Sequence, residues 1–242
     1  MSFLRRLLAV FPLVTPALRA AETDTRPLQI FPAVEPAAAV ATFRVQDGFT
    51  MELLAAEPLL ASPVAVAYDE DGQAYVAEMR DYPYTDKRTH RPYEENTTDA
   101  SLGRIRRLID DDGDGKFDRS VVFAEDLSWP TGVACWKGGV FVTATPDIWY
   151  LKDTDGDHRA DVRIRVFTGF RKFNIQTAVN SPVWGLDNRI TIATSSNGGT
   201  LTRPGQPAVP PIKLGGRDLR LDPRDNSVEL IAGGTARFGQ SY

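Results

Sequence analysis

The apolar and polar residues of this chain alternate with a period of two over most of its length. Short runs rich in Val, Ile, Phe and Tyr are separated by Gly, Asp, Asn and Pro, which is typical of β-strands joined by turns. The sequence shows no comparable stripe with the helical period. The pattern therefore predicts an all-β protein from residue 43 to residue 242.

The predicted strands fall into sets of four, over residues 65–125, 132–169 and 182–233, although the run "GGTLTRPGQPAVPP" disturbs the third set. Each set opens on a proline, namely Pro63, Pro130 and Pro182. Repeats of four strands are the signature of a β-propeller, and a β-sandwich is the structural alternative. We expect an incomplete arc of about three four-stranded blades, because a closed ring needs about 4 to 8. The β-rich run "FRVQDGFTMELLAAEP" should add an N-terminal strand, and the continuation of the propeller should be missing from this fragment.

Two acidic runs of equal length, "DDDGDGKFD" and "DTDGDHRAD", align without a gap between the predicted third and fourth strands of the first two blades. A sandwich does not explain why such a loop recurs at one place in the unit. Calcium takes about 6–8 oxygen ligands, and carboxylates at this spacing gather several of them around a small volume. The expected ligands are Asp110, Asp112, Asp114, the Lys116 carbonyl and Asp118 in the first loop, and Asp153, Asp155, Asp157 and Asp161 in the second.

These loops differ from EF-hand loops, in which a bidentate Glu stands at position 12. Val121 and Ile164 occupy that position here. Gly115 suits the tight turn at position 6, where a positive φ is needed, whereas the second loop has His158. We therefore expect the second loop to bind calcium more weakly. A series of Asx turns that holds no metal is the alternative for both loops.

The N-terminus has the layout of a secretory signal peptide over residues 1–21. Arg5 and Arg6 precede an apolar stretch from Leu7 to Leu18, and the small residues Ala20 and Ala21 follow. The stretch is shorter than the roughly 20 residues of a membrane span. Residues 22–42 include a Pro/Ala-rich segment and are predicted to be a linker. The mature chain is expected to be periplasmic or secreted.

Composition excludes several classes of function. A net charge of −4 and a pI near 5.3 give no electrostatic footprint for nucleic acid. Cys135 is the single cysteine, so the chain has no internal disulfide and no Cys-x-x-Cys-His haem attachment. The sequence contains no GxSxG element that would support a Ser-His-Asp triad.

Two long runs carry a resemblance to a known family: "DGFTMELLAAEPLLASPVAVAYDEDGQAYVAEMRDYP" and "GRIRRLIDDDGDGKFDRSVVFAEDLSWPTGVACWKGGVFVTATPDIWYLKDTDGDHRADVRIRVFTGF". They resemble the membrane-bound dehydrogenase family, which is related to sorbosone dehydrogenase and to pyrroloquinoline-quinone-dependent sugar dehydrogenases. The resemblance spans Phe43 to Tyr242. It implies a propeller of about six blades in an exported protein. In the full-length protein, it also implies helical repeats and a cytochrome c-type haem domain downstream.

The activity that the resemblance implies is quinone-dependent oxidation of a sugar or alcohol, with electrons passed to the downstream haem. Matching "AEMRDY" to the relatives makes Glu78, Arg80 and Tyr82 candidates for binding the quinone. Thr177 stands where the relatives have a catalytic histidine, and its hydroxyl does not accept a proton near neutral pH without help. Two alternatives stay open: a non-catalytic, calcium-braced propeller that binds carbohydrate or protein, and a lactonase-like, metal-dependent hydrolase.

Overall fold

The computed structural model describes residues 30–81 and 101–233. The chain divides into two compact units, residues 1–35 and residues 36–242. Residues 30–35 of the first unit have no regular secondary structure, and the expected signal peptide lies outside the described residues. The second unit begins inside the expected linker, with helix α1 (Pro36–Ala39) and the 3-10 turn η1 (Val40–Thr42). None of the described helices has the length and apolarity needed to cross a membrane.

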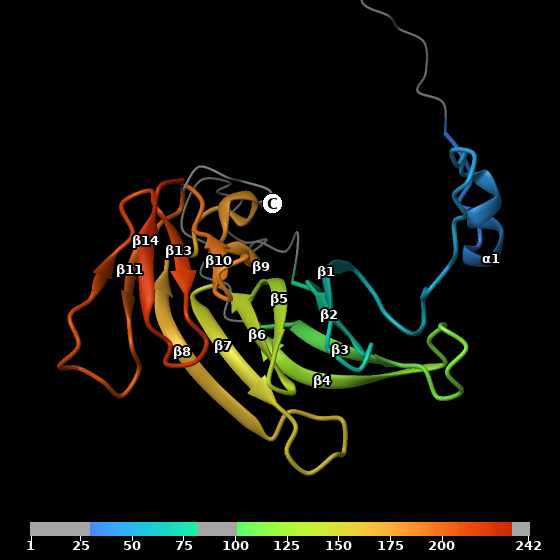
Figure 1. Ribbon diagram of the computed structural model, residues 1–242. Coiled ribbons are helices and arrows are strands. Elements are labelled where there is room, and N and C mark those ends of the chain that lie inside the picture. The colour runs from blue at the N-terminus through green and yellow to red at the C-terminus, as the bar shows by residue number, and fades with distance from the viewer. Residues whose placement is uncertain (1–29, 82–100, 234–242) are drawn as a thin grey trace, which may run out of the picture. The chain divides into compact units, whose positions relative to one another are not determined.

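The described strands form three antiparallel sheets, which we call blades 1, 2 and 3 (Figure 1). Blade 1 has the order β1 (Pro63–Tyr68), β2 (Ala74–Glu78), β3 (Gly103–Ile109) and β4 (Arg119–Leu127). Blade 2 begins with β5 (Pro130–Trp136), β6 (Gly139–Ala144), β7 (Asp147–Lys152) and β8 (Val162–Phe170). Blade 3 has the order β9 (Asn180–Trp184), β10 (Ile190–Ala193), β13 (Asp218–Leu221) and β14 (Val228–Ile231). All twelve strands of the three predicted sets are thus present.

The run that disturbs the third set forms a hairpin of β11 (Gly199–Thr202) and β12 (Ile212–Lys213). This hairpin joins blade 2 rather than blade 3, because β11 pairs with β8. The strands approach closely where Gly199 lies opposite Phe170, and a Cβ at Gly199 would meet the Gly169 carbonyl oxygen at 2.3 Å. The inserted hairpin therefore covers an edge of blade 2 that would otherwise expose unpaired backbone groups.

The first strands of the blades lie next to one another, with β5 beside both β1 and β9. Gly132 of β5 packs against Pro182 of β9, and a Cβ at Gly132 would meet the proline Cδ at 2.3 Å. A Cβ at Gly103 of blade 1 would meet Cδ of Pro130 in the same way. Four-stranded antiparallel sheets with adjacent first strands are the arrangement of propeller blades. The described residues thus have an all-β fold, an open arc of three β-propeller blades.

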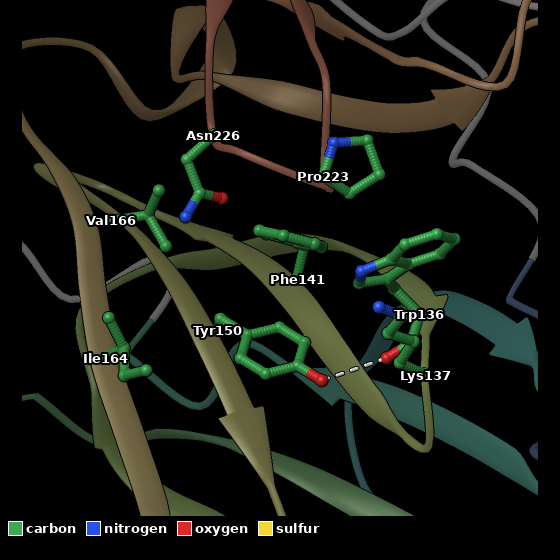
Figure 2. Close-up of a pocket in the computed structure, with 8 residues that line it drawn as sticks. All are labelled: Trp136, Lys137, Phe141, Tyr150, Ile164, Val166, Pro223 and Asn226. Atoms are coloured by element: carbon green, nitrogen blue, oxygen red, sulfur yellow. Dashed lines mark hydrogen bonds between the residues drawn. The ribbon is translucent and has the colours of Figure 1, made fainter.

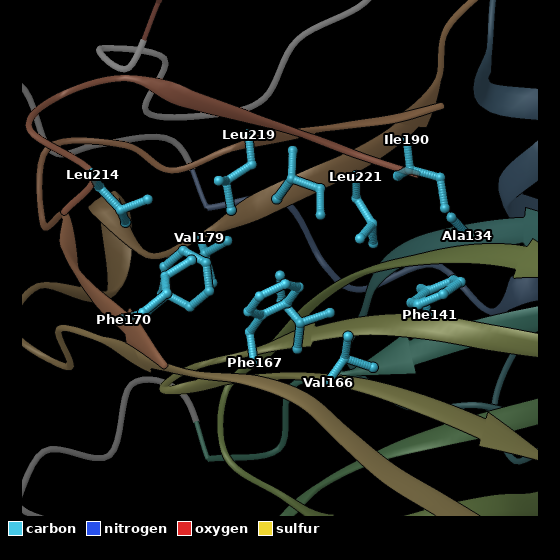
Figure 3. Packing of buried hydrophobic residues seen from close by; sticks show 13 residues of the cluster. Ala134, Phe141, Val166, Phe167, Phe170, Val179, Ile190, Leu214, Leu219 and Leu221 are labelled. Atoms are coloured by element: carbon cyan, nitrogen blue, oxygen red, sulfur yellow. The ribbon is translucent and has the colours of Figure 1, made fainter. Parts of the chain in front are cut away.

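The core lies between the faces of consecutive blades. Strand β6 is buried along its whole length, and its side chains alternate between two clusters. Val140 and Val142 pack in the cluster that holds Phe123 of blade 1. Phe141 joins the cluster that holds Leu219 of blade 3 (Figure 3). Each such side chain contributes about 1.5–3 kcal/mol by leaving water, so the middle blade is held on both faces.

The expected N-terminal strand is not formed, because residues 43–62 run as turns and irregular chain. A strand needs a neighbour for its backbone groups, and no described strand pairs with this segment. Its last part instead crosses one face of blade 1. Ala55 and Leu60 pack on Val76, and the Leu59 carbonyl oxygen accepts a hydrogen bond from the Ser120 hydroxyl.

Candidate functional site

The first acidic loop, residues 110–118, connects β3 to β4 as expected. Its carboxylates accept hydrogen bonds from the backbone of the loop itself. Asp110 accepts from the amides of Gly113 and Gly115, at 2.7 and 2.9 Å. Asp118 closes the loop by accepting from the Asp111 amide at 2.8 Å. The bond from Gly115 is the main reason that the pKa of Asp110 lies below its ordinary value.

The second acidic loop, residues 153–161, connects β7 to β8 and repeats the same hydrogen bonds. Asp153 accepts from the amides of Gly156 and His158, at 2.7 and 2.9 Å, and Asp161 accepts from the Thr154 amide at 2.7 Å. Burial acts to raise the pKa of Asp153, but the two amide bonds lower it below its ordinary value. The Thr154 hydroxyl and amide lower the pKa of Asp161. The gapless sequence alignment thus corresponds to one loop structure that occurs twice.

The same backbone conformation occurs at the turn positions of both loops. Gly113 and Gly156 have φ of +75° and +84°, and Gly115 and His158 have φ of +88° and +69°. The positive φ expected at position 6 is therefore present in both loops. His158 adopts it despite its Cβ, which costs about 1–2 kcal/mol.

In each loop, three carboxylates have oxygens within 4.8 Å of one another. Oxygens on opposite sides of a calcium ion lie about 4.6–5.2 Å apart, so both groups fit this cation. The groups are Asp110, Asp112 and Asp118, and Asp153, Asp155 and Asp157. Asp114 lies outside the first group, and its carboxylate is 3.7 Å from the Lys116 ammonium. Asp161 lies outside the second and receives the Thr154 hydrogen bonds.

Blade 3 carries an aspartate, Asp222, at the equivalent place, directly after its third strand β13. In this blade, side chains of the protein balance the negative charge of the carboxylate. Arg224 forms an ion pair with the Asp222 carboxylate at 2.5 Å, and Arg189 lies 3.7 Å from it. The side-chain hydrogen bond from Arg224 is the main reason that the pKa of Asp222 falls to about 2. In this blade, arginines of the chain neutralise the carboxylate that follows the third strand.

The second loop also contacts the neighbouring blade. The Ala160 amide donates to the Phe123 carbonyl oxygen of β4 at 2.8 Å. Asp153 lies 3.7 Å from the guanidinium of Arg107 on β3. Just beyond the loop, Arg163 donates to the Glu125 carbonyl oxygen at 2.7 Å. The conformation of this loop is therefore coupled to the contact between blades 1 and 2.

The three candidates for quinone binding are placed differently. Glu78 has 0% of its surface exposed, accepts the Ala61 amide at 2.6 Å, and forms ion pairs with Arg104 and Arg106 on β3. It holds β2, β3 and the preceding segment together. Arg80 is exposed directly after β2. Tyr82 lies outside the described residues.

Thr177 lies in the 3-10 turn η2 (Ile175–Thr177) and is buried. Its hydroxyl lies 2.6 Å from Oδ1 of Asn197 and 3.2 Å from the Asn174 carbonyl oxygen. The amide of Asn197 donates to the same carbonyl at 2.7 Å. Thr177 thus has the contacts of a residue that fixes the β8–β9 connection to the β10–β11 connection.

Asp81 is a candidate functional residue that was not predicted from the sequence. Its carboxylate is 2% exposed, and one oxygen accepts the Trp129 amide at 2.9 Å. The other oxygen is buried and has no hydrogen-bond partner in the part of the chain that the structure describes. Burial raises the pKa of Asp81 above its ordinary value. Trp129 in turn packs against Ala178, which follows Thr177, so Asp81 lies near the segment that contains Thr177.

Comparisons with known proteins find a distant structural match and a protein family to which the sequence matches. A crystal structure of a candidate 6-phosphogluconolactonase from Bacteroides uniformis ATCC 8492 matches with a TM-score of 0.35 and 15% identity. The match covers 72% of this chain and 57% of that one, so this chain spans less than two thirds of its length. No curated protein matches the chain. Residues 35–242 match the family described as Domain of unknown function (DUF7133), and the chain belongs to that family.

Proposed function

We propose that this chain is a calcium-braced β-propeller module of an exported protein, and that the module binds carbohydrate. The observation that carries the proposal is the pair of acidic loops with one hydrogen-bond framework. In each loop, the atoms that would bind a metal are hard carboxylate oxygens, and they lie within 4.8 Å of one another. Calcium prefers such donors, and its flexible coordination suits irregular loops.

Blade 3 supplies the internal comparison that favours an ion over a simple turn. There, the carboxylate after the third strand has two arginines beside it. Of the loop-1 carboxylates, Asp111 has Arg119 at 2.7 Å and Asp114 has Lys116. Within the described part of the chain, Asp110, Asp112 and Asp118 form no ion pair. A solvated carboxylate pair at about 4 Å repels by roughly 1 kcal/mol. A bound calcium ion would remove this repulsion.

The role of the ions would be structural. The first would fix the turn between β3 and β4, and hence the register of the two outer strands of blade 1. The second would hold a loop that already contacts β4 through the Ala160 amide. Calcium at the second loop would therefore stabilise the packing of blade 2 on blade 1.

A carbohydrate array with the purified chain tests the binding function. We expect binding to a defined set of glycans in the presence of calcium and weaker binding after chelation, because loss of the ions loosens the blades. Lack of binding to every glycan, with the protein shown to be folded by circular dichroism, would contradict this function.

Oxidation of a sugar or alcohol, with electrons passed to a downstream cytochrome c-type domain, is the second candidate. Asp81 favours it, because a buried carboxylate with a raised pKa is suited to hold a proton near the segment of Thr177. Arg104 and Arg106 are already paired with Glu78, so neither is free to bind a carboxylate of pyrroloquinoline quinone. Reconstitution of the full-length protein with the quinone and calcium tests this candidate. Turnover that is lost in Asp81→Asn and kept in Thr177→Ala would support it.

A further inference from the structure

A cavity of about 260 Å³ lies between blade 2 and the turn that joins β13 to β14 in blade 3 (Figure 2). Blade 2 contributes Trp136, Phe141, Tyr150 and Val166, and the turn contributes Pro223 and Asn226. All the residues that line the cavity belong to the part of the chain that the structure describes. The volume is slightly below the about 300–1,000 Å³ of pockets for drug-sized molecules. The cavity therefore suits a ligand with the size of a single ring.

The walls of the cavity are aromatic and held in fixed positions. The rings of Phe141 and Tyr150 pack at 5.0 Å between centroids, and the Trp136 ring packs on Trp184 at 5.6 Å. The Tyr150 hydroxyl donates to the Trp136 carbonyl oxygen at 3.0 Å. A ligand would find these rings already ordered, which lowers the entropy lost on binding.

The polar groups around the cavity comprise both hydrogen-bond donors and acceptors, and the Asn226 amide supplies both kinds. Among the described residues, Oδ1 of Asn226 is buried and has no hydrogen-bond partner, so a ligand that supplies a donor would satisfy it. The residue is anchored through its backbone, because Arg203 donates to the Asn226 carbonyl oxygen at 2.6 Å. The Tyr150 oxygen, whose proton is committed to Trp136, retains a lone pair. Lys137 is the cationic donor of the cavity and lies over the Trp136 ring at 5.5 Å.

An acceptor that lacks a donor lies beside groups that donate, namely the Lys137 ammonium and the Asn226 side-chain N–H groups. This combination favours a ligand with hydroxyl groups, because a hydroxyl both donates and accepts whereas the oxygens of a carboxylate or phosphate only accept. Aromatic walls favour a ring that presents C–H groups on its faces. We propose that this cavity binds one neutral pyranose ring, with a sugar hydroxyl donating to Asn226 Oδ1 and a second donating to the Tyr150 oxygen. This inference rests on the proposed carbohydrate-binding function and locates its site.

The test uses saturation-transfer NMR and titration of the whole chain with methyl glucoside, methyl galactoside and methyl mannoside. Asn226→Gly removes the amide and keeps the backbone conformation, since Asn226 has φ of +58°. Asn188→Gly is the matched control, because Asn188 also has φ of +58° and lies in the exposed β9–β10 turn. Tyr150→Phe removes only the hydroxyl. We expect Asn226→Gly to weaken binding about tenfold and Tyr150→Phe several-fold, with Asn188→Gly unchanged.

Each of the other outcomes contradicts one part of the proposal. Pyranosides that bind Asn226→Gly and Tyr150→Phe as well as the wild type would exclude this cavity and leave carbohydrate binding intact. Benzoate or glucuronate binding more tightly than the neutral pyranosides in the same cavity would exclude the ligand class. Lack of binding to any pyranoside, together with a blank carbohydrate array, would overturn the proposed function as well.

Discussion

Gly115 and His158 adopt the same left-handed backbone conformation at equivalent positions of two loops, with φ of +88° and +69°. Each amide donates to the first aspartate of its own loop, at 2.9 Å in both cases. Glycine reaches this conformation without strain, whereas histidine does not. The two loops therefore have the same backbone structure, but we expect the second to be less stable because it is strained at His158.

We expect His158→Gly to stabilise the second loop by about 0.5–1 kcal/mol, because the strain of a Cβ at positive φ disappears while glycine loses more backbone entropy on folding. Gly115→Ala should destabilise the first loop by about 1 kcal/mol for the same reason. A Cβ at Gly115 would meet no atom within 4 Å, so strain alone acts there. Urea unfolding of both variants measures these changes. Equal stabilities of Gly115→Ala and the wild type would contradict the interpretation.

Substitutions at the contact between Gly132 and Pro182 should reduce the stability of the protein. The Cβ in Gly132→Ala would meet the Pro182 Cδ at 2.3 Å, which forces the first strands of blades 2 and 3 apart. Such overpacking costs about 1–3 kcal/mol. Pro182→Ala in the same chain should recover part of the loss, and a double-mutant cycle in urea measures this coupling. Strictly additive effects of the two changes would show that the strands do not touch there.

Asp81 and Asp222 should affect stability with opposite dependence on pH. Burial raises the folded pKa of Asp81, so its contribution is present below the ordinary pKa near 4 and is lost as the pH rises through the folded value. Asp81→Asn keeps an acceptor for the Trp129 amide. It should therefore gain stability relative to the wild type as the pH rises above about 4. Urea unfolding between pH 4 and pH 8 measures the difference, and a pH-independent difference would contradict the raised pKa.

Asp222 is the matched comparison. Its folded pKa of about 2 lies below the ordinary value, so its contribution is present above pH 4 and is lost as the pH falls through about 2. Asp222→Asn should therefore be less stable than the wild type at pH 7, and the two should converge toward pH 2. Thermal unfolding across this range checks the sign.

Export is a separate expectation from the N-terminal sequence. The charged, apolar and small-residue order of residues 1–21 should direct removal of the signal peptide near Ala20 or Ala21. N-terminal sequencing of the protein from the cell envelope checks this expectation. A mature protein that still begins at Met1 would contradict it.

The strands of the three blades could be predicted because short runs rich in Val, Ile, Phe and Tyr are bounded by Gly, Asp, Asn and Pro, and this signal also holds for strands such as β6 that are buried on both faces. The destination of β11 and β12 could not, since local pattern does not tell which open edge a hairpin will join. The turn of His158 was predictable because its loop aligned with one that has glycine. Asp81 was missed because its burial depends on Trp129, which lies 48 residues away in sequence. No local signal marks such a contact.

Calcium titration of the metal-free chain by calorimetry tests the bracing of the blades most directly. We expect two ions per chain, with tighter binding at the first loop. Asp112→Asn with Asp118→Asn should abolish one site, and Asp155→Asn with Asp157→Asn the other. Asp225→Asn in the arginine-neutralised turn of blade 3 is the control and should keep both. Each lost site should also reduce the rise in unfolding temperature that calcium produces. Two sites that persist in both loop variants, or a wild-type chain that binds no calcium, would contradict the calcium-braced propeller.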